Sequence, residues 1–81
     1  MFENIIELIQ EIAEDRTVPR NIREKCNEAI EILKDESQEK DVRINAVTGL
    51  LDEISNDTNI PMYTRTQIWN IASLLEAAKK E

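Results

Sequence analysis

The sequence repeats itself, without a gap, at a constant offset of 42 residues, which is the separation of Pro19 and Pro61. The stretch from Leu8 to Leu33 aligns at this offset with the stretch from Leu50 to Leu75. Identical residues pair throughout: Leu8/Leu50, Glu11/Glu53, Ile12/Ile54, Asp15/Asp57, Pro19/Pro61, Arg23/Arg65 and Leu33/Leu75. A period of this length indicates one supersecondary unit that is used more than once. The chain must therefore fold as two copies of the same unit.

Each half contains two segments in which apolar residues recur at helical spacing. The four apolar stripes are Ile5, Leu8, Ile9 and Ile12; Ile22, Cys26, Ala29, Ile30 and Leu33; Val42, Ala46, Val47, Leu50, Leu51 and Ile54; and Ile68, Ile71, Ala72, Leu75 and Ala78. Tight β-turns are also disfavoured, because the chain has one Gly and none of the Gly-containing dipeptides that hairpins use. We predict helices over about 3–15, 19–34, 39–56 and 61–80.

The start of the second helix in each half has two readings. Pro19 and Pro61 suit the first turn of a helix, where a missing N–H costs nothing. A later start is also consistent with the sequence, with Thr64 as the cap, Gln67 completing a capping box and Tyr63 packing on Ile68; Asn21 and Glu24 match it in the first half. In the linker 35–40, Ser37 or Asp41 is predicted to cap the third helix.

These elements predict an all-α fold in a single domain, residues 1–81, with repeat units of about 5–34 and 47–78. The architecture that fits the short linkers is a four-helix up-and-down bundle made of two repeated helical hairpins. The alternative is a stack of two units like HEAT repeats. Gly49 falls inside the third helix, and we expect it to permit the close approach of a neighbouring helix.

Charge and composition reduce the number of function classes that fit the chain. The net charge is −7, from 17 acidic and 10 basic residues, which disfavours binding to phosphate backbones. The chain has no His, one Cys and no signal peptide or membrane-length apolar run, so we expect a cytoplasmic protein. Cys26 lies on an apolar stripe without a histidine base, and we expect a buried, unreactive thiol.

Acidic pairs such as Glu11 with Asp15 are numerous, but four short helices leave little room for a cleft. We expect Arg23 and Arg65 to form ion pairs with the acids before the prolines, Asp15 and Asp57. No metal site, cofactor or catalytic residue is predicted, and we expect that the protein is not an enzyme.

Two surfaces are candidates for binding. Trp69 lies off the apolar stripe of the fourth helix, Arg65 precedes it by one turn and could stack on it, and Leu74 is also off the stripe. Similar off-stripe residues are Ile6, Ile32 and Ile44, and together they favour a protein-interaction module, with a protein partner or a homodimer. The alternative is a nucleic-acid or ribonucleoprotein accessory protein that uses a basic cluster, Arg16, Arg20, Arg23 and Lys25.

Three strings carry a resemblance to a known family: Asp15-Arg16-Thr17-Val18-Pro19-Arg20-Asn21-Ile22-Arg23, Leu51-Asp52-Glu53-Ile54-Ser55-Asn56-Asp57 and Thr64-Arg65-Thr66-Gln67-Ile68-Trp69. The sequence resembles, over essentially its whole length, a family of small archaeal proteins of uncharacterised function. The resemblance implies a compact four-helix bundle in the archaeal cytoplasm, and it implies no activity, cofactor or site residue. A weaker similarity to HEAT repeats lies in Asp41-Val42-Arg43-Ile44-Asn45-Ala46.

Overall fold

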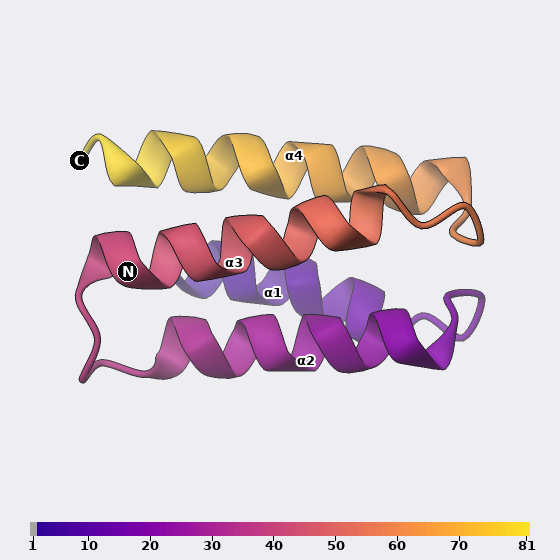
Figure 1. Ribbon diagram of the computed structural model, residues 1–81, viewed down its shortest axis with the longest axis horizontal. Coiled ribbons are helices and arrows are strands. Elements are labelled where there is room, and N and C mark those ends of the chain that lie inside the picture. The colour runs from indigo at the N-terminus through magenta and orange to yellow at the C-terminus, as the bar shows by residue number, and fades with distance from the viewer. Residues whose placement is uncertain (1) are drawn as a thin grey trace.

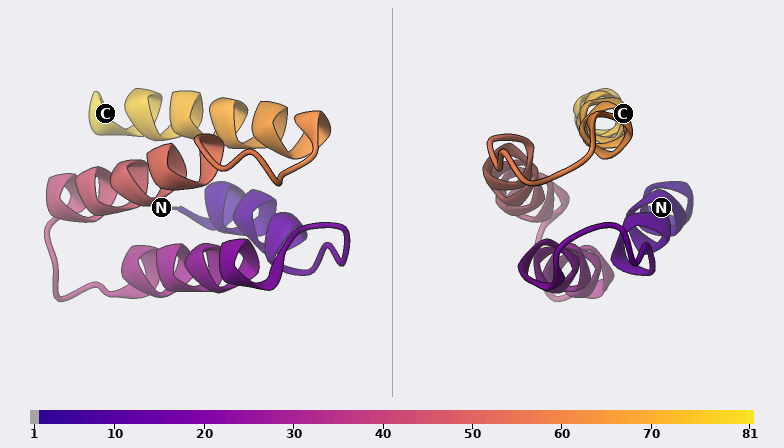
Figure 2. Two further views of the ribbon diagram at one scale, coloured as in Figure 1. Left: turned by 45° about the vertical axis from the view of Figure 1, so that its right-hand side comes forward. Right: turned by 90° about the vertical axis from the view of Figure 1, so that its right-hand side faces the viewer.

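The computed structural model describes residues 2–81, and these residues form four consecutive antiparallel helices (Figure 1). The helices are α1 (Glu3–Ala13), α2 (Arg20–Lys34), α3 (Lys40–Ser55) and α4 (Met62–Lys79). Within this part of the chain each helix packs on its neighbours in sequence and α1 also meets α4, while no diagonal pair is in contact (Figure 2). A HEAT-like stack would pack α1 on α3 and α2 on α4. The closed ring therefore confirms the bundle, and each predicted helix boundary is correct to within two residues.

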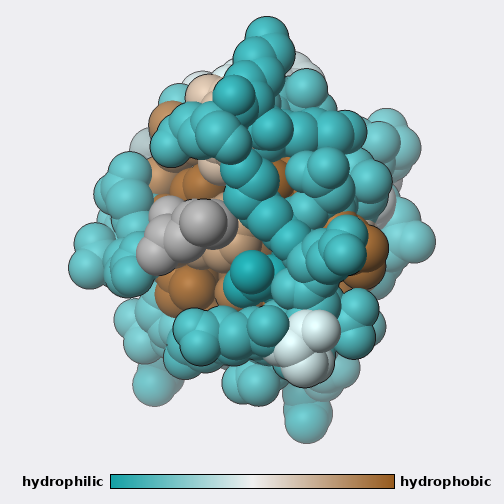
Figure 3. Space-filling view, turned by 90° about the vertical axis from the view of Figure 1, so that its left-hand side faces the viewer, coloured by the Kyte–Doolittle hydropathy of each residue, from teal (hydrophilic) through white to brown (hydrophobic). Residues whose placement is uncertain are grey.

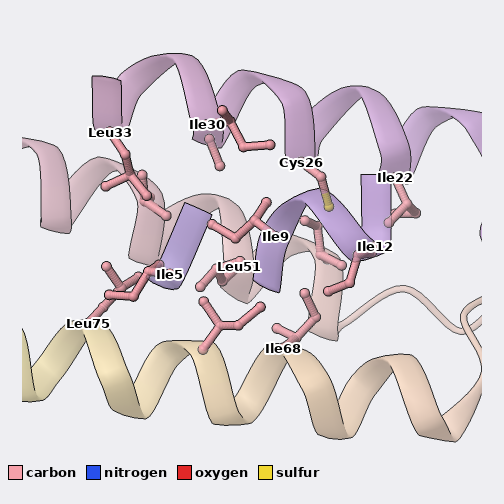
Figure 4. Packing of buried hydrophobic residues seen from close by; sticks show 14 of the residues in the cluster. Ile5, Ile9, Ile12, Ile22, Cys26, Ile30, Leu33, Leu51, Ile68 and Leu75 are labelled. Atoms are coloured by element: carbon pink, nitrogen blue, oxygen red, sulfur yellow. The ribbon is translucent and has the colours of Figure 1, made fainter. Parts of the chain in front are cut away.

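The interior reproduces the sequence repeat. Nine buried positions of the first half have a buried counterpart 42 residues later: Phe2/Ile44, Ile5/Val47, Ile9/Leu51, Ile12/Ile54, Val18/Ile60, Ile22/Thr64, Cys26/Ile68, Ala29/Ile71 and Leu33/Leu75. Side chains of this set from all four helices converge between the ribbons (Figure 4). Apart from Ile30, whose counterpart Ala72 is half-buried, the two hairpins bury the same positions, and a residue of one hairpin can be compared directly with its counterpart in the other.

The buried face of α3 differs from the predicted stripe. Val42 is 50 % exposed and Ala46 is exposed, whereas Ile44, which we predicted to lie off the stripe, is fully buried. Ile44, Val47, Leu51 and Ile54 also have helical spacing, and they match the buried positions of α1. The larger side chains therefore face the interior, and the smaller Val42 and Ala46 are left outside.

Gly49 lies on this same outer side of α3, where an added Cβ would meet no atom within 4 Å. The predicted close approach of a neighbouring helix at Gly49 is wrong, because the residue faces solvent rather than another helix.

One turn type joins the helices at all three corners. The Oδ1 atoms of Asp15, Asp35 and Asp57 accept a hydrogen bond from the backbone N–H two residues later, at 2.9, 3.1 and 2.8 Å. This is the Asx-turn that aspartate favours. Hydrogen bonds from Thr17 and Ser37 to these carboxylates hold the pKa values of Asp15 and Asp35 below their ordinary values.

The helices begin directly after these turns. Pro19 and Pro61 are the extended residues that precede α2 and α4, and Glu39 has the same position before α3. None of these three helix starts has a side-chain cap, so the caps predicted at Asn21, Thr64, Ser37 or Asp41 are wrong. Ser37 instead bonds Asp35, and Thr64 is buried in the core.

Candidate functional site

The outer side of α4 carries three of the four large hydrophobic side chains that are exposed in residues 2–81. Met62, Tyr63 and Trp69 are 65 %, 70 % and 55 % exposed. We define the α4 face as the six exposed residues between positions 62 and 75 of α4: Met62, Tyr63, Thr66, Trp69, Asn70 and Ser73. Met62, Thr66, Trp69 and Ser73 follow one another at i, i+4, i+7 and i+11, so they form one continuous strip along the helix.

The α4 face is uncharged, in a chain of which 33 % is charged. From Met62 to Leu75 the only charged residue is Arg65, and it is half-buried. Protein–protein interfaces are enriched in aromatic residues and Met at their centre and depleted of Lys, Glu and Asp. The α4 face has this composition.

The first hairpin provides an internal control for the α4 face. Its counterparts on α2 are also exposed, and they are Arg20, Asn21, Glu24, Asn27, Glu28 and Glu31. Four of these six residues are charged and none is apolar. Because α2 and α4 bury equivalent positions, the fold does not require an aromatic outer side at this location. The apolar character of the α4 face is therefore an addition to the scaffold.

Arg65 does not take the position that we predicted. Its Nε donates to the carbonyl of Ser55 at 3.1 Å and its Nη2 to the carbonyl of Asp57 at 2.9 Å. The predicted ion pair with the Asp57 carboxylate is therefore wrong, because the guanidinium binds the carbonyl of Ser55 at the end of α3, which has no helical partner, and the carbonyl of Asp57 in the turn that follows. The cation–π contact in the described chain joins Arg43 to Phe2, at 5.1 Å, and not Arg65 to Trp69.

Arg23 and Arg43 make the same kind of contact in the other two corners. The Nε of Arg23 donates to the carbonyl of Val18 at 3.1 Å, and the Nη1 of Arg43 donates to the carbonyl of Leu33 at 2.9 Å. The carboxylate of Asp15 accepts bonds from Thr17, so its predicted pairing with Arg23 is also wrong. Each of the three arginines follows its turn aspartate by eight residues. The sequence contains this Asp–Arg spacing three times, and the 42-residue comparison reveals only two of them.

The basic cluster is largely engaged within the protein. Arg20 pairs with Glu24 at 3.2 Å, and Lys25 pairs with Glu53 of α3 at 3.2 Å. Arg23 binds its own turn, as described above. Arg20 therefore has an acidic partner and Arg23 has a main-chain carbonyl, so the structure does not gather them into an uninterrupted positive patch. Neither residue adjoins the α4 face.

Leu74 is half-buried and packs against the core, as Ile6 and Ile32 also do. It is five residues from Trp69, which places it about 140° away around the helix. The structure therefore does not bring Leu74 and Trp69 together, and the neighbours of Trp69 on the same strip are Thr66 and Ser73. Sequence reasoning missed Met62 and Tyr63, although the lack of acidic residues from position 62 to 75 is visible in the sequence.

The remaining candidate chemistry is limited. Burial raises the pKa of the Cys26 thiol to about 11, so the thiol stays protonated at neutral pH, whereas a nucleophilic cysteine needs its thiolate. Residues 2–81 contain no group of three or more His, Cys, Asp or Glu side chains that could hold a metal ion. No helix in this range is long and apolar enough to span a membrane.

Two open surface depressions among residues 2–81 have volumes of about 410 and 420 Å³. The first lies among Phe2, Ile6, Leu33 and Arg43, at the end of the bundle where α1 begins. Figure 3 looks onto this end, where apolar surface is interrupted by hydrophilic side chains. Phe2 and Leu33 are themselves at most 3 % exposed, so this hollow offers a ligand little apolar surface.

The fold defines an all-α class of small protein, a closed four-helix bundle of two equivalent hairpins. The family model described as "Uncharacterised protein family (UPF0147)" matches residues 1–78. The chain belongs to the UPF0147 family. This finding confirms the predicted membership in an archaeal family of uncharacterised function.

Relatives come from several archaea. The chain is 44% identical over 79 residues to a UPF0147 protein of Methanothermobacter thermautotrophicus, covering 98% of this chain and 78% of the relative. It is 50% identical over 72 residues to a UPF0147 protein of Methanocaldococcus jannaschii, covering 89% of this chain and 77% of the relative.

Two crystal structures share the fold. One is that of the unknown function protein MMP1188, with a TM-score of 0.88 and 49% identity over 93% of this chain and 85% of that one. The other is a UPF0147 protein from Thermoplasma acidophilum, with a TM-score of 0.90 and 37% identity over 94% of this chain and 89% of that one.

Proposed function

We propose that this protein is a non-catalytic interaction module that binds another polypeptide through the α4 face. The observation that carries the proposal is the contrast between α4 and α2. The two helices bury equivalent positions but differ in their exposed residues. The counterpart of Trp69 in the first hairpin is Asn27, and the counterpart of Met62 is Arg20. An exposed Trp and an exposed Met two turns apart on one uncharged helix side are residues typical of an interface centre.

The apolar area supports binding to protein rather than to a charged polymer. The strip through Met62, Thr66 and Trp69 has hydroxyl, thioether and indole groups, and it lacks the cationic side chains that contact phosphates. A partner surface that is apolar at its centre and polar at its edge would bury Trp69 and hydrogen-bond Thr66 and Asn70.

Photo-crosslinking in the cells that make the protein tests this proposal. A benzophenone amino acid replaces Thr66 in the α4 face, and in a matched control it replaces Glu24, the exposed counterpart of Thr66 on α2. We expect covalent adducts with a polypeptide, of whatever identity, at least several-fold more abundant from position 66 than from position 24. Equal yields from the two positions, or no adduct from position 66, would overturn the proposal.

A further inference from the structure

We infer that the polypeptide that covers the α4 face is a second copy of this chain, packed α4 against α4 in antiparallel orientation about a two-fold axis. The inference rests on the proposed function and names its partner. It is argued from the distribution of side-chain size and charge along α4.

The two halves of the α4 face differ in side-chain size. Met62, Tyr63 and Trp69 are the large side chains, whereas the exposed residues beyond them, Ser73 and Ala77, are small. A two-fold axis between residues 69 and 70 places Met62 of one copy opposite Ala77 of the other and Thr66 opposite Ser73. Met62 then meets a small side chain, as close packing requires, and the two Trp69 side chains lie beside each other at the axis. A parallel pairing would instead put large on large and leave a gap beside the small residues.

The charges at the edge of the face follow the same symmetry. Arg65 lies in the first half of α4, and Glu76 lies in the second. The antiparallel pairing brings the Arg65 of each copy toward the Glu76 of the other, whereas a parallel pairing would keep these opposite charges about 16 Å apart along the helix axis. The carbonyls that Arg65 already binds do not neutralise its positive charge, so this attraction remains.

The net charge restricts where two copies can meet. Each chain carries −7, and the equivalent side of α2 would bring Glu24, Glu28 and Glu31 against their copies. The α4 face avoids such contacts, because Met62 to Leu75 contains no acidic residue. Added salt screens the remaining repulsion between the two acidic chains, so association should strengthen as ionic strength rises.

The interface is small. A single helix side contributes less than the roughly 800 Å² per partner of a standard interface, so we expect a dissociation constant of about 10–500 μM. The first measurement is therefore sedimentation equilibrium of the full chain from about 10 μM to about 1 mM. The expected result is a mass that rises from 9.4 kDa toward twice that value. Emission from Trp69, the only tryptophan, should shift to shorter wavelength over the same range.

Two double variants test the geometry. Thr66→Glu with Ser73→Glu gives α4 the acidic residues that α2 has at the same positions, Glu24 and Glu31, so the fold should tolerate them. We expect this variant to remain monomeric up to about 1 mM, as an interface lined by like charges should. Thr66→Lys with Ser73→Glu should restore the dimer, because each Lys then faces the Glu of the other copy only when the helices are antiparallel.

The outcomes separate the inference from the proposed function. A wild-type chain that stays monomeric overturns the second-copy inference, and so does a dimer that Thr66→Glu with Ser73→Glu leaves intact. A dimer that the Lys/Glu variant fails to restore overturns the antiparallel geometry. If the wild-type chain is monomeric and position 66 crosslinks to a different polypeptide in cells, the interaction module stands with another partner. If position 66 gives no adduct at all, the proposed function fails.

Discussion

At the scale of single residues, position 64 shows what the duplicated core tolerates. Thr64 is fully buried where the first hairpin has Ile22, and it is the only buried polar side chain in the described residues. Its Oγ1 is enclosed without a hydrogen-bond partner. A buried hydroxyl in this state costs about 1–3 kcal/mol of desolvation. The second hairpin therefore has a weaker interior at this point than the first.

We predict that Thr64→Val stabilises the protein by about 1 kcal/mol, because the valine keeps the shape and removes the unpaired hydroxyl. Urea unfolding followed by circular dichroism measures the change. The reciprocal variant Ile22→Thr is the matched control and should lose stability, since it places the same hydroxyl in the equivalent site of the first hairpin. A loss of stability in Thr64→Val would contradict the prediction.

Gly49 is a second site where one atom changes stability. Its side of α3 is open, so an added methyl group meets no steric resistance. Gly49→Ala should raise the free energy of unfolding by about 0.5–1 kcal/mol, through the smaller backbone entropy of the unfolded chain. Thermal unfolding checks this prediction. Ala46→Gly, on the same exposed side of α3, is the control and should lower the melting temperature. An unchanged or lower melting temperature for Gly49→Ala would be inconsistent with an open helical position.

At the scale of elements, the three corners share a device made of an aspartate and an arginine eight residues later. The aspartate closes the turn, and the arginine returns to main-chain carbonyls of the turn or of the preceding helix. Arg65 makes two such bonds, to Ser55 and Asp57. The arginine therefore holds α4 to the end of α3 through charge-assisted hydrogen bonds.

Arg65→Met should lower the free energy of unfolding by about 2 kcal/mol, because it keeps the aliphatic stem and removes charge-assisted bonds to carbonyls. Arg20→Met is the matched control in α2. Its side chain is 86% exposed and pairs only with Glu24, so we expect a change below about 0.5 kcal/mol. Chemical denaturation of both variants gives the comparison. Equal losses would show that the bonds of Arg65 contribute no more than a surface ion pair.

At the scale of the whole molecule, the ring of four helices has one weak side. α1 is the shortest helix, with 11 residues, and its contact with α4 is the least extensive of the four helix–helix contacts. The right-hand view of Figure 2 shows α1 and α4 closing the square. Gln67 lies at this junction beside Leu8, and its Oε1 is buried without a partner. We therefore expect local opening of the bundle to need the least free energy at the junction of α1 and α4.

Hydrogen exchange at the level of single amides checks this. We predict that the amides in the middle of α1 exchange faster than those in the middle of α2 and α3, since partial opening of α1 leaves the other three helices in contact. The second hairpin supplies the reference, because α3 occupies the position equivalent to α1. Uniform protection of α1 and α3 would mean that the bundle opens only as a unit.

Most of the architecture could be predicted from the sequence, because helix period and the repeat both depend on large side chains that the core must contain. Ile12 and Ile54 illustrate this, since they are buried at equivalent places. The face of α3 could not be predicted, because Val42 and Ile44 belong to two patterns of equal regularity. Met62 and Tyr63 were missed because their helix start had two readings. The turn arginines were assigned to carboxylates because periodicity gives no information on carbonyls.

The difference between α2 and α4 has a consequence for how an assembly ends. These two helices do not contact each other and lie at diagonally opposite corners of the square. A bundle of two identical hairpins would have two copies of any self-associating surface, facing in opposite directions. Each molecule could then bind two others, and the assembly would grow into an open fibre. Here one of the two sides bears Trp69 and the other bears Glu28. Under the second-copy inference, this difference between α2 and α4 limits growth, because a closed pair leaves no second surface from which polymerisation can continue.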